Sequence, residues 1–275
     1  MNLYQTFSDI ANAIRSKTGW TNQFTPLEMP DAINNISGGG GVDPNDYKIF
    51  VNEGSGYVES EALKAFVGSE WNNSFNKATF NYPVLIGNNV TSCANMFSYA
   101  SVFNQPVTIP DNVTNCAYMF YYANMFNQPV TIPDNVTDCA VMFADTSKFN
   151  QPVTIPDNVT NCDSMFYYAT MFNQPVTIPN NVTNCYAMFS SASNFNQPVI
   201  IGNNVTNCAY MFNNASNFNQ PVIIPDHVTS CAYMFSNAKI FNQSIIIPDS
   251  VTNCSYMFSN CREKRSNIYI KRTSS

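Results

Sequence analysis

Cysteine recurs in this chain at one fixed interval. Eight of its nine cysteines, from Cys93 to Cys254, follow a constant 23-residue period. The same period carries a Met-Phe pair, first at Met96-Phe97, and the motif Phe-Asn-Gln-Pro, first at residues 103–106. A period of about 20 to 50 residues is typical of solenoids, propellers and other arrays. Because a propeller blade or a helical hairpin needs a longer repeat, this period favours one coil of a solenoid.

Each repeat contains one segment that is typical of a strand. In Pro-Val-Thr-Ile-Pro, β-branched residues predominate and prolines bound the run, and the Pro-Asp-Asn that follows is typical of a turn. Asn-Val-Thr-Asn-Cys suits a second extended segment, and Ala-Tyr-Met-Phe-Tyr-Tyr-Ala predicts a short helix. No repeat buries its apolar face alone, so stacking must join these faces into one core. The eight repeats begin at Phe80, Phe103, Phe126, Phe149, Phe172, Phe195, Phe218 and Phe241.

The stack is expected to continue beyond the eighth repeat. One further period carries Ile245 and Ile247 onto Ile268 and Ile270, which predicts a ninth strand at residues 267–271. Charged residues flank this strand, as suits an edge that must not aggregate. The expected parts are an N-terminal cap at 46–79, the repeats at 80–263, and a cap strand with a tail at 264–275.

The cysteines are expected to form a buried ladder. A metal site needs several thiolates or imidazoles around one ion, whereas each repeat supplies one Cys and His227 is the only histidine. Buried cysteine behaves as a small apolar residue, so we predict no metal site and no cofactor. Cys261 falls where six repeats carry alanine, and we expect a free thiol there. The ladder comprises Cys93, Cys116, Cys139, Cys162, Cys185, Cys208, Cys231 and Cys254.

Catalytic residue types are scarce in the repeats. They hold no Glu and a single His, so the chain is not expected to be an enzyme. Turn aspartates such as Asp111 and Asp134 leave an alternative open, because carboxylates of neighbouring repeats stand close enough for a Ca²⁺ site or a glycosidase pair. Exposed turn residues are the simpler interpretation. The recurring Asn-Val-Thr matches the N-glycosylation pattern, but its place in the repeat favours turn and ladder residues.

Charge and hydropathy restrict the partners. Residues 80–261 carry eight Asp and only Lys148 and Lys239 as bases, whereas a nucleic-acid groove needs clustered Lys and Arg. No run of about 18 apolar residues predicts a membrane span, and residues 1–5 do not begin a secretion signal. We therefore expect a product of a reducing cytoplasm that binds no nucleic acid and does not insert into membranes.

Two surfaces differ between repeats and are candidate binding sites. Tyrosine, serine and asparagine dominate the positions after Cys and after Met-Phe, and antibody paratopes favour the same residue types. The alternative is unselected variation of an inert surface. The strand face changes from Thr108, Thr131, Thr154 and Thr177 to Ile200, Ile223 and Ile246. The tyrosine ridge comprises Tyr118, Tyr121, Tyr122, Tyr167, Tyr168, Tyr210 and Tyr233.

Residues 1–37 differ from the repeats. Apolar residues spaced as on one helix face, and a second segment that starts at Pro30, predict two short helices. Two short helices make no stable core alone, so this module is expected to anchor on a partner or on copies of itself. The glycine-rich residues 38–45 then form a flexible linker. The anchoring residues are Ile10, Ile14, Ile33 and Ile36.

The repeat motifs resemble a known family. Phe103-Asn104-Gln105-Pro106, residues 112–114 and Met119-Phe120 resemble the BspA-like leucine-rich repeats of bacterial surface proteins, over residues 80–261. Cysteine here replaces a larger inward apolar residue, and valine stands where leucine is common. The resemblance implies a leucine-rich-repeat-like solenoid, with a parallel β-strand stack and short helical or turn segments. It also implies adhesion or protein binding.

The N-terminal module has a resemblance of its own. Residues 9–19 and 29–33 look like the start of tail and minor structural proteins from phages of Gram-positive bacteria, which implies a virion anchor. The sequence thus predicts a phage tail-associated adhesin, or receptor-binding protein, located in the virion.

Such an adhesin would present its solenoid to a host cell-surface protein or polysaccharide. Residues 1–37 would bind other tail or baseplate proteins, and a homo-oligomer is a further expectation. The alternatives are a BspA-like adhesin or interaction protein on the bacterial surface, a purely structural tail spacer, and a depolymerase of wall polysaccharide.

Overall fold

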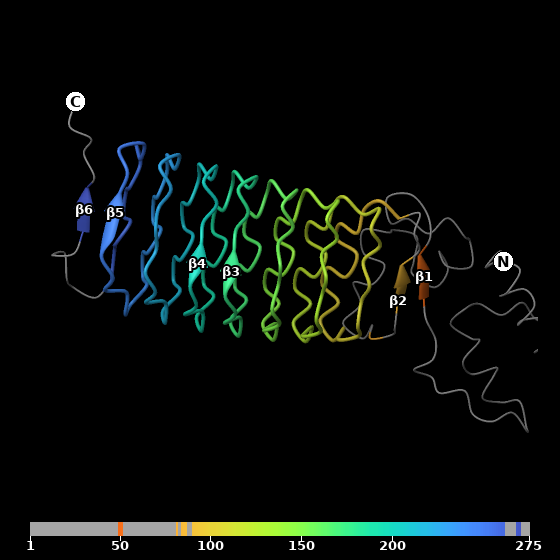
Figure 1. Cartoon of the computed structure of the whole chain (residues 1–275). Coiled ribbons are helices and arrows are strands. Elements are labelled where there is room, and N and C mark those ends of the chain that lie inside the picture. The colour runs from red at the N-terminus through yellow and green to blue at the C-terminus, as the bar shows by residue number, and fades with distance from the viewer. Residues whose placement is uncertain (1–48, 52–80, 82–83, 87–89, 262–267, 271–275) are drawn as a thin grey trace, which may run out of the picture.

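The repeats form coils that stack side by side in one row (Figure 1). The computed structural model describes residues 49–51, 81, 84–86, 90–261 and 268–270. We number the coils 1 to 8 in chain order, so that coil 1 begins at Phe80 and coil 8 at Phe241. The solenoid expected from the period is confirmed. The predicted helices and anchoring isoleucines of residues 1–37 and the linker at 38–45 lie outside the described residues.

Six short strands lie in three parallel pairs within the described residues. At the N-terminal end of the row, β1 (Ile49–Val51) pairs with β2 (Val84–Ile86). In the middle, β3 (Val176–Thr177) pairs with β4 (Val199–Ile200). At the far end, β5 (Ile245–Ile247) pairs with β6 (Ile268–Ile270).

The register of the last pair confirms the predicted ninth strand. Ile245 lies opposite Ile268, and Ile247 lies opposite Ile270, one period further along the chain. The second extended segment is confirmed as well, because the residue before each cysteine forms a parallel bridge with its counterpart in the next coil. These bridges run without a gap from Ser92–Asn115 to Ser230–Asn253.

Of the short helical or turn segments expected after each cysteine, the structure shows the turns, because that segment is a series of tight turns and not a helix. In coil 2 the N–H of Met119 donates to the carbonyl of Cys116 over 3.2 Å, and the N–H of Tyr121 donates to that of Tyr118 over 3.1 Å. Tyr118 and Tyr122 both have a φ of 59°, which a right-handed helix excludes. The N–H of Tyr118 bonds to the next coil instead, at the carbonyl of Ala140 (2.9 Å).

Two ladders of phenylalanine fill the centre of the solenoid. The first runs from Phe97 to Phe258, with ring centroids 5.4–5.7 Å apart in successive coils. The second runs from Phe103 to Phe241 at 5.8–6.0 Å. The two ladders meet most closely where one coil passes into the next, as for Phe166 of coil 4 and Phe172 of coil 5 at 4.0 Å. Each inner ring therefore packs against aromatic neighbours in both adjacent coils.

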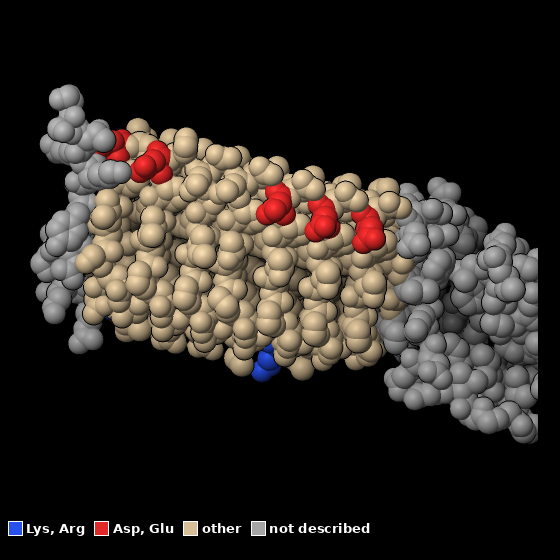
Figure 2. All heavy atoms as spheres, viewed as in Figure 1, with Lys and Arg blue, Asp and Glu red and all other residues tan. Residues whose placement is uncertain are grey.

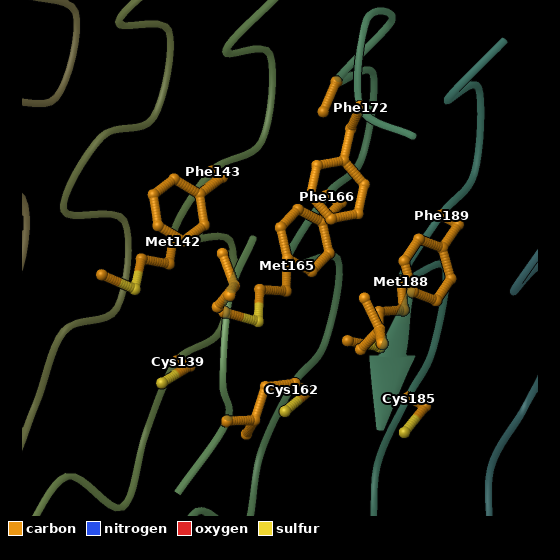
Figure 3. Packing of buried hydrophobic residues seen from close by; sticks show 14 of the residues in the cluster. Cys139, Met142, Phe143, Cys162, Met165, Phe166, Phe172, Cys185, Met188 and Phe189 are labelled. Carbon is orange, nitrogen blue, oxygen red and sulfur yellow. The ribbon is translucent and has the colours of Figure 1, made fainter. Parts of the chain in front are cut away.

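Cysteine, methionine and phenylalanine of neighbouring coils lie in three parallel rows (Figure 3). The seven ladder cysteines from Cys93 to Cys231 are buried free thiols. Burial raises the pKa of Cys116, Cys162 and Cys231 to about 12, so the core holds them as neutral thiols.

The last rung of the cysteine ladder differs from the prediction. Cys254 is exposed, because within the described residues no later turn segment packs over coil 8. Cys261 is a free, partly buried thiol, as expected. Its S–H donates to the carbonyl of Phe235 over 2.7 Å. Thr146, which also replaces the repeat alanine, donates to Phe120 in the same register.

Polar ladders join the coils at the surface. The N–H of Asn127 donates to Oδ1 of Asn104, and the N–H of Asn150 donates to Oδ1 of Asn127, both over 2.9 Å. In the turn, Nδ2 of Asn135 donates to the carbonyl of Asp111 over 2.8 Å. Asn158 and Asn181 make the same bond as Asn135, so these asparagines of the glycosylation-like pattern are turn and ladder residues, as predicted.

Replacing Phe166 by alanine should destabilise the solenoid by about 3–5 kcal/mol, because the ring is fully buried and the cavity cannot collapse between rigid coils. Phe258 in coil 8 is partly buried and stacks on one ladder neighbour, so Phe258→Ala should cost less. Urea unfolding followed by circular dichroism measures both losses. Equal losses of stability would contradict the inference that rings in both adjacent coils stabilise each inner phenylalanine.

A thiol reagent at pH 8 should label Cys254 first. The buried ladder cysteines should react only when the protein unfolds, because burial withholds them from the reagent and keeps them protonated. Peptide mapping by mass spectrometry assigns the labelled sites, and labelling in urea supplies the fully reactive control. Fast labelling of Cys139 or Cys162 in the native protein would place the ladder at the surface.

Candidate binding surface

Two positions in every coil hold the backbone in the left-handed region, with φ between 51° and 61°. The first lies two positions after the cysteine and the second lies six positions after it. Both positions differ strongly between repeats, so the sequence variation lies on two turn corners. The first corner carries Asn95, Tyr118, Val141, Ser164, Ala187, Tyr210, Tyr233 and Tyr256. The second carries Tyr99, Tyr122, Asp145, Tyr168, Ser191, Asn214, Asn237 and Asn260.

Hydrogen bonds between coils hold these corners in place. The N–H of Tyr118 donates to Ala140, and that of Tyr122 donates to Ala144 over 3.0 Å. The left-handed region costs an L-residue about 1–2 kcal/mol relative to the right-handed one. The bond at each corner and the packing of the adjacent Met-Phe pair offset this cost. Each corner therefore keeps its left-handed backbone conformation, whichever side chain it carries.

Tyrosines of coils 1 and 2 form one cluster at these corners. Tyr99 and Tyr122 stack at 5.2 Å, and Tyr121 meets Tyr99 edge to face at 5.1 Å. Tyr121 also contacts Tyr118 at 5.7 Å. Partial burial, followed by a hydrogen bond with Tyr99, raises the pKa of Tyr121 to about 12. Tyr121 is thus a neutral phenol at physiological pH, and Tyr118 and Tyr122 of the cluster are exposed.

The predicted tyrosine ridge is not one continuous surface. Coil 3 interrupts it, because Val141 and Asp145 occupy the two corners there, and burial raises the pKa of the Asp145 carboxyl. Tyr167 and Tyr168 pair edge to face at 4.7 Å in coil 4. Of the predicted ridge residues, Tyr118, Tyr122 and Tyr168 are exposed, whereas Tyr121, Tyr167, Tyr210 and Tyr233 are partly buried.

A second row of tyrosines runs along coils 5 to 8. Tyr186 and Tyr210 lie 5.4 Å apart, Tyr210 and Tyr233 4.6 Å, and Tyr233 and Tyr256 4.9 Å. Tyr186 and Tyr256 were not among the predicted site residues. The repeat period identifies Tyr256, because it lies one period after Tyr233. It does not identify Tyr186, which lies one position before the corner.

A groove of about 540 Å³ lies beside this row. Ala209 and Ala232 line it between the tyrosines and a row of polar residues from the extended segments, which includes Asn207, Ser230 and Asn253. Among the described residues that line the groove, none is charged. Tyr186 stands in the alanine position of coil 5 and joins the lining at that end of the groove.

The strand face is exposed along its whole described length. Thr108, Thr131, Thr154 and Thr177 are exposed, and so are the isoleucines that replace threonine in coils 6 to 8. The exposed fraction is 65% for Ile200, 85% for Ile223 and 57% for Ile246. The apolar half of the strand face therefore lies in the same coils as the groove.

Carboxylates gather along one edge of the solenoid, in two groups separated by a neutral stretch (Figure 2). The exposed turn aspartates are Asp111, Asp134, Asp157, Asp226 and Asp249, with asparagine in coils 5 and 6.

In the described part of the chain no group of three acidic, His or Cys side chains converges on a metal position. That same part contains no helix with the length and hydropathy of a membrane span.

The repeats match one family model, described as Mycoplasma protein of unknown function, DUF285. The match covers residues 69–154, 110–200 and 179–272, which together exceed half of the chain. The chain belongs to the DUF285 family. No curated protein matches its sequence. The family match begins at residue 69, so the phage-tail resemblance of residues 9–33 stays a prediction.

This DUF285 protein is similar in fold to a leucine-rich repeat protein from Bacteroides ovatus. The two superpose with a TM-score of 0.55 at 17% sequence identity, over 81% of this chain and 59% of the other. The chain thus spans less than two thirds of that structure. At this identity the likeness shows the fold alone, and it confirms a leucine-rich-repeat-like solenoid.

Replacing Val141 by asparagine should stabilise the protein by about 1 kcal/mol, because a β-branched residue fits the left-handed region poorly and asparagine tolerates it. The reverse change at the same corner of coil 1, Asn95→Val, should destabilise it by a similar amount. Urea midpoints of the two variants measure the difference. A loss of stability in the first variant, or no change in either, would show that the corners carry no backbone strain.

Proposed function

We propose that this DUF285 protein is a recognition module that attaches to a macromolecule of a bacterial surface through its turn corners. A BspA-like adhesin or interaction protein without a phage role fits the family and the fold best. The single observation that carries the proposal is the location of the variable residues. The buried Cys, Met and Phe repeat almost unchanged from coil to coil, while the corners change between tyrosine, asparagine, serine and other residues.

The chemistry of the corners suits recognition. Tyrosine supplies rigid contact area and a hydrogen-bonding hydroxyl, and it is among the residues that dominate binding energy at interfaces. Tyr118, Tyr122 and Tyr168 are exposed on the first four coils, together with Met125 and Met171. Exposed methionine adapts to differently shaped partners. A scaffold with no partner would gain nothing from this apolar surface.

A more specific form of the proposal is that the protein is part of a phage virion and attaches the virion to its host. It depends on residues 1–37 as an anchor to a tail or baseplate, while the solenoid supplies the recognition surface in either case. Finding the chain in the proteome of purified virions would support it. A chain that is found only on bacterial cells supports the adhesin.

Removing the exposed corner tyrosines should weaken attachment without unfolding the protein. In the triple variant Tyr118→Ala, Tyr122→Ala and Tyr168→Ala, binding of the labelled full-length chain to a panel of bacterial cells should fall at least about tenfold. Alanine fits these corners, because Ala187 already occupies one with a φ of 51°. Circular dichroism and the urea midpoint confirm the fold.

The matched control is a triple alanine variant of the strand face, at Thr131, Thr154 and Thr177. It removes three exposed side chains from coils 3 to 5, and attachment should stay unchanged. If the corner variant binds as well as the wild type, the corners are not the attachment surface. If no cell in the panel binds the wild-type chain, the solenoid is better explained as a structural spacer.

A further inference from the structure

We infer that the groove beside Tyr210, Tyr233 and Tyr256 binds an uncharged, hydroxyl-rich oligosaccharide. This inference rests on the proposed function, because it names one ligand class of the proposed recognition surface. It concerns coils 5 to 8, whereas the exposed tyrosines tested above lie in coils 1 to 4. Its lining consists of phenols (the tyrosine wall), alanine side chains, and amides and hydroxyls.

The tyrosine wall offers ring edges and hydroxyls rather than ring faces. Tyr233 is stacked between Tyr210 and Tyr256, with interplanar angles of 11° and 20°. Its faces are therefore covered, and only its edge and hydroxyl remain available. The edge of an aromatic ring carries partial positive charge, and the phenol hydroxyl donates a hydrogen bond. Such a wall attracts the lone pairs of oxygen atoms.

The amides and hydroxyls of the lining add further hydrogen-bonding groups. Oδ1 of Asn207 accepts the N–H of Ala209, and Oδ1 of Asn253 accepts that of Ser255. These bonds fix both side chains on their own coils and leave the Nδ2 groups as donors. Ser230 of coil 7 stands between Asn207 and Asn253 in the same register, so amides and a hydroxyl form one row of hydrogen-bonding groups. A ligand with regularly spaced hydroxyls matches such a row.

The lining that the structure describes is uncharged, which selects against ionic ligands. None of these described residues is Lys, Arg, Asp or Glu. Partial burial, and then the phenols of Tyr210 and Tyr256, raise the pKa of Tyr233, so this phenol stays neutral. A charged ligand would lose hydration without an ion pair in return.

A peptide fits this groove less well than a saccharide. An extended peptide binds to a free strand edge through main-chain hydrogen bonds. Here the backbone beside the groove is already bonded to the next coil, as the N–H of Tyr210 donates to Ala232 over 2.8 Å and that of Tyr233 to Ser255 over 2.9 Å. The groove thus offers side chains only, which suits a ligand that is recognised by its hydroxyls.

The test uses the full-length chain and uncharged hexasaccharides of glucose, galactose, mannose and N-acetylglucosamine, with a glucuronate-containing hexasaccharide as the charged comparison. Calorimetry or fluorescence should detect binding of at least one neutral hexasaccharide, and weaker binding of the charged one. Tyr233→Phe, which removes one hydroxyl and keeps the stack, should weaken binding several-fold.

The decisive variant is Ala232→Tyr, which fills the groove with a side chain that the scaffold already carries at this position in coil 5, as Tyr186. It should reduce binding at least tenfold. Ala140→Tyr, the same change in coil 3 outside the groove, is the matched control and should bind as the wild type does.

Three results would overturn the inference. They are no binding of any neutral hexasaccharide, equal binding of the charged one, and full binding by the Ala232→Tyr variant. If Ala232→Tyr abolishes a cell attachment that survives removal of wall polysaccharide, the groove binds a protein and the inference is also wrong. Attachment through Tyr118, Tyr122 and Tyr168 is measured separately, so the proposed function stands or falls on its own result.

Discussion

The structure depends on backbone hydrogen bonds that join each coil to the next in constant register. The N–H groups of Cys139, Val141, Phe143 and Asp145 in coil 3 donate to carbonyls of coil 4 over 2.7–3.1 Å. These four donors alternate with N–H groups that close tight turns within the coil. Neighbouring coils must therefore share one backbone path, including its two left-handed corners. The phenylalanine ladders can stack at a constant spacing only because this path is shared.

This register explains which parts of the fold the sequence predicts. The repeat period places β6 opposite β5 and puts Cys93 to Cys231 in one buried row, since identical positions in stacked coils must coincide. The turn corners were missed because the usual signal is absent. Glycine marks a left-handed residue in most turns, whereas Tyr118, Val141 and Ala187 stand at these corners and carry no such mark. Without that mark, the run Ala-Tyr-Met-Phe-Tyr-Tyr-Ala was compatible with about one turn of helix.

The candidate site was predictable as a set of positions but not as a shape. Comparing repeats identified the corner tyrosines, because variation within one chain needs no structure to be seen. How these tyrosines group in space depends on substitutions in single repeats, which the repeat period does not reveal. Tyr186 lies one position off the corner yet extends the row of Tyr210, and Val141 with Asp145 interrupts the cluster of coils 1 and 2. The groove arises from alanine at positions 209 and 232, which a comparison of repeats does not single out.

The two halves of the solenoid differ on their surfaces while their cores agree. Coils 1, 2 and 4 carry exposed corner tyrosines and coils 2 to 5 carry exposed threonine on the strand face, whereas coils 6 to 8 carry a stacked tyrosine row and exposed isoleucine. Packing does not require this change. Thr154 and Ile223 are both exposed, and each lies between a buried valine and a buried isoleucine. Exposed isoleucine also lowers solubility. A difference that folding does not need is best explained by contact with partners, and two partners, or two parts of one, fit a surface that is divided in this way.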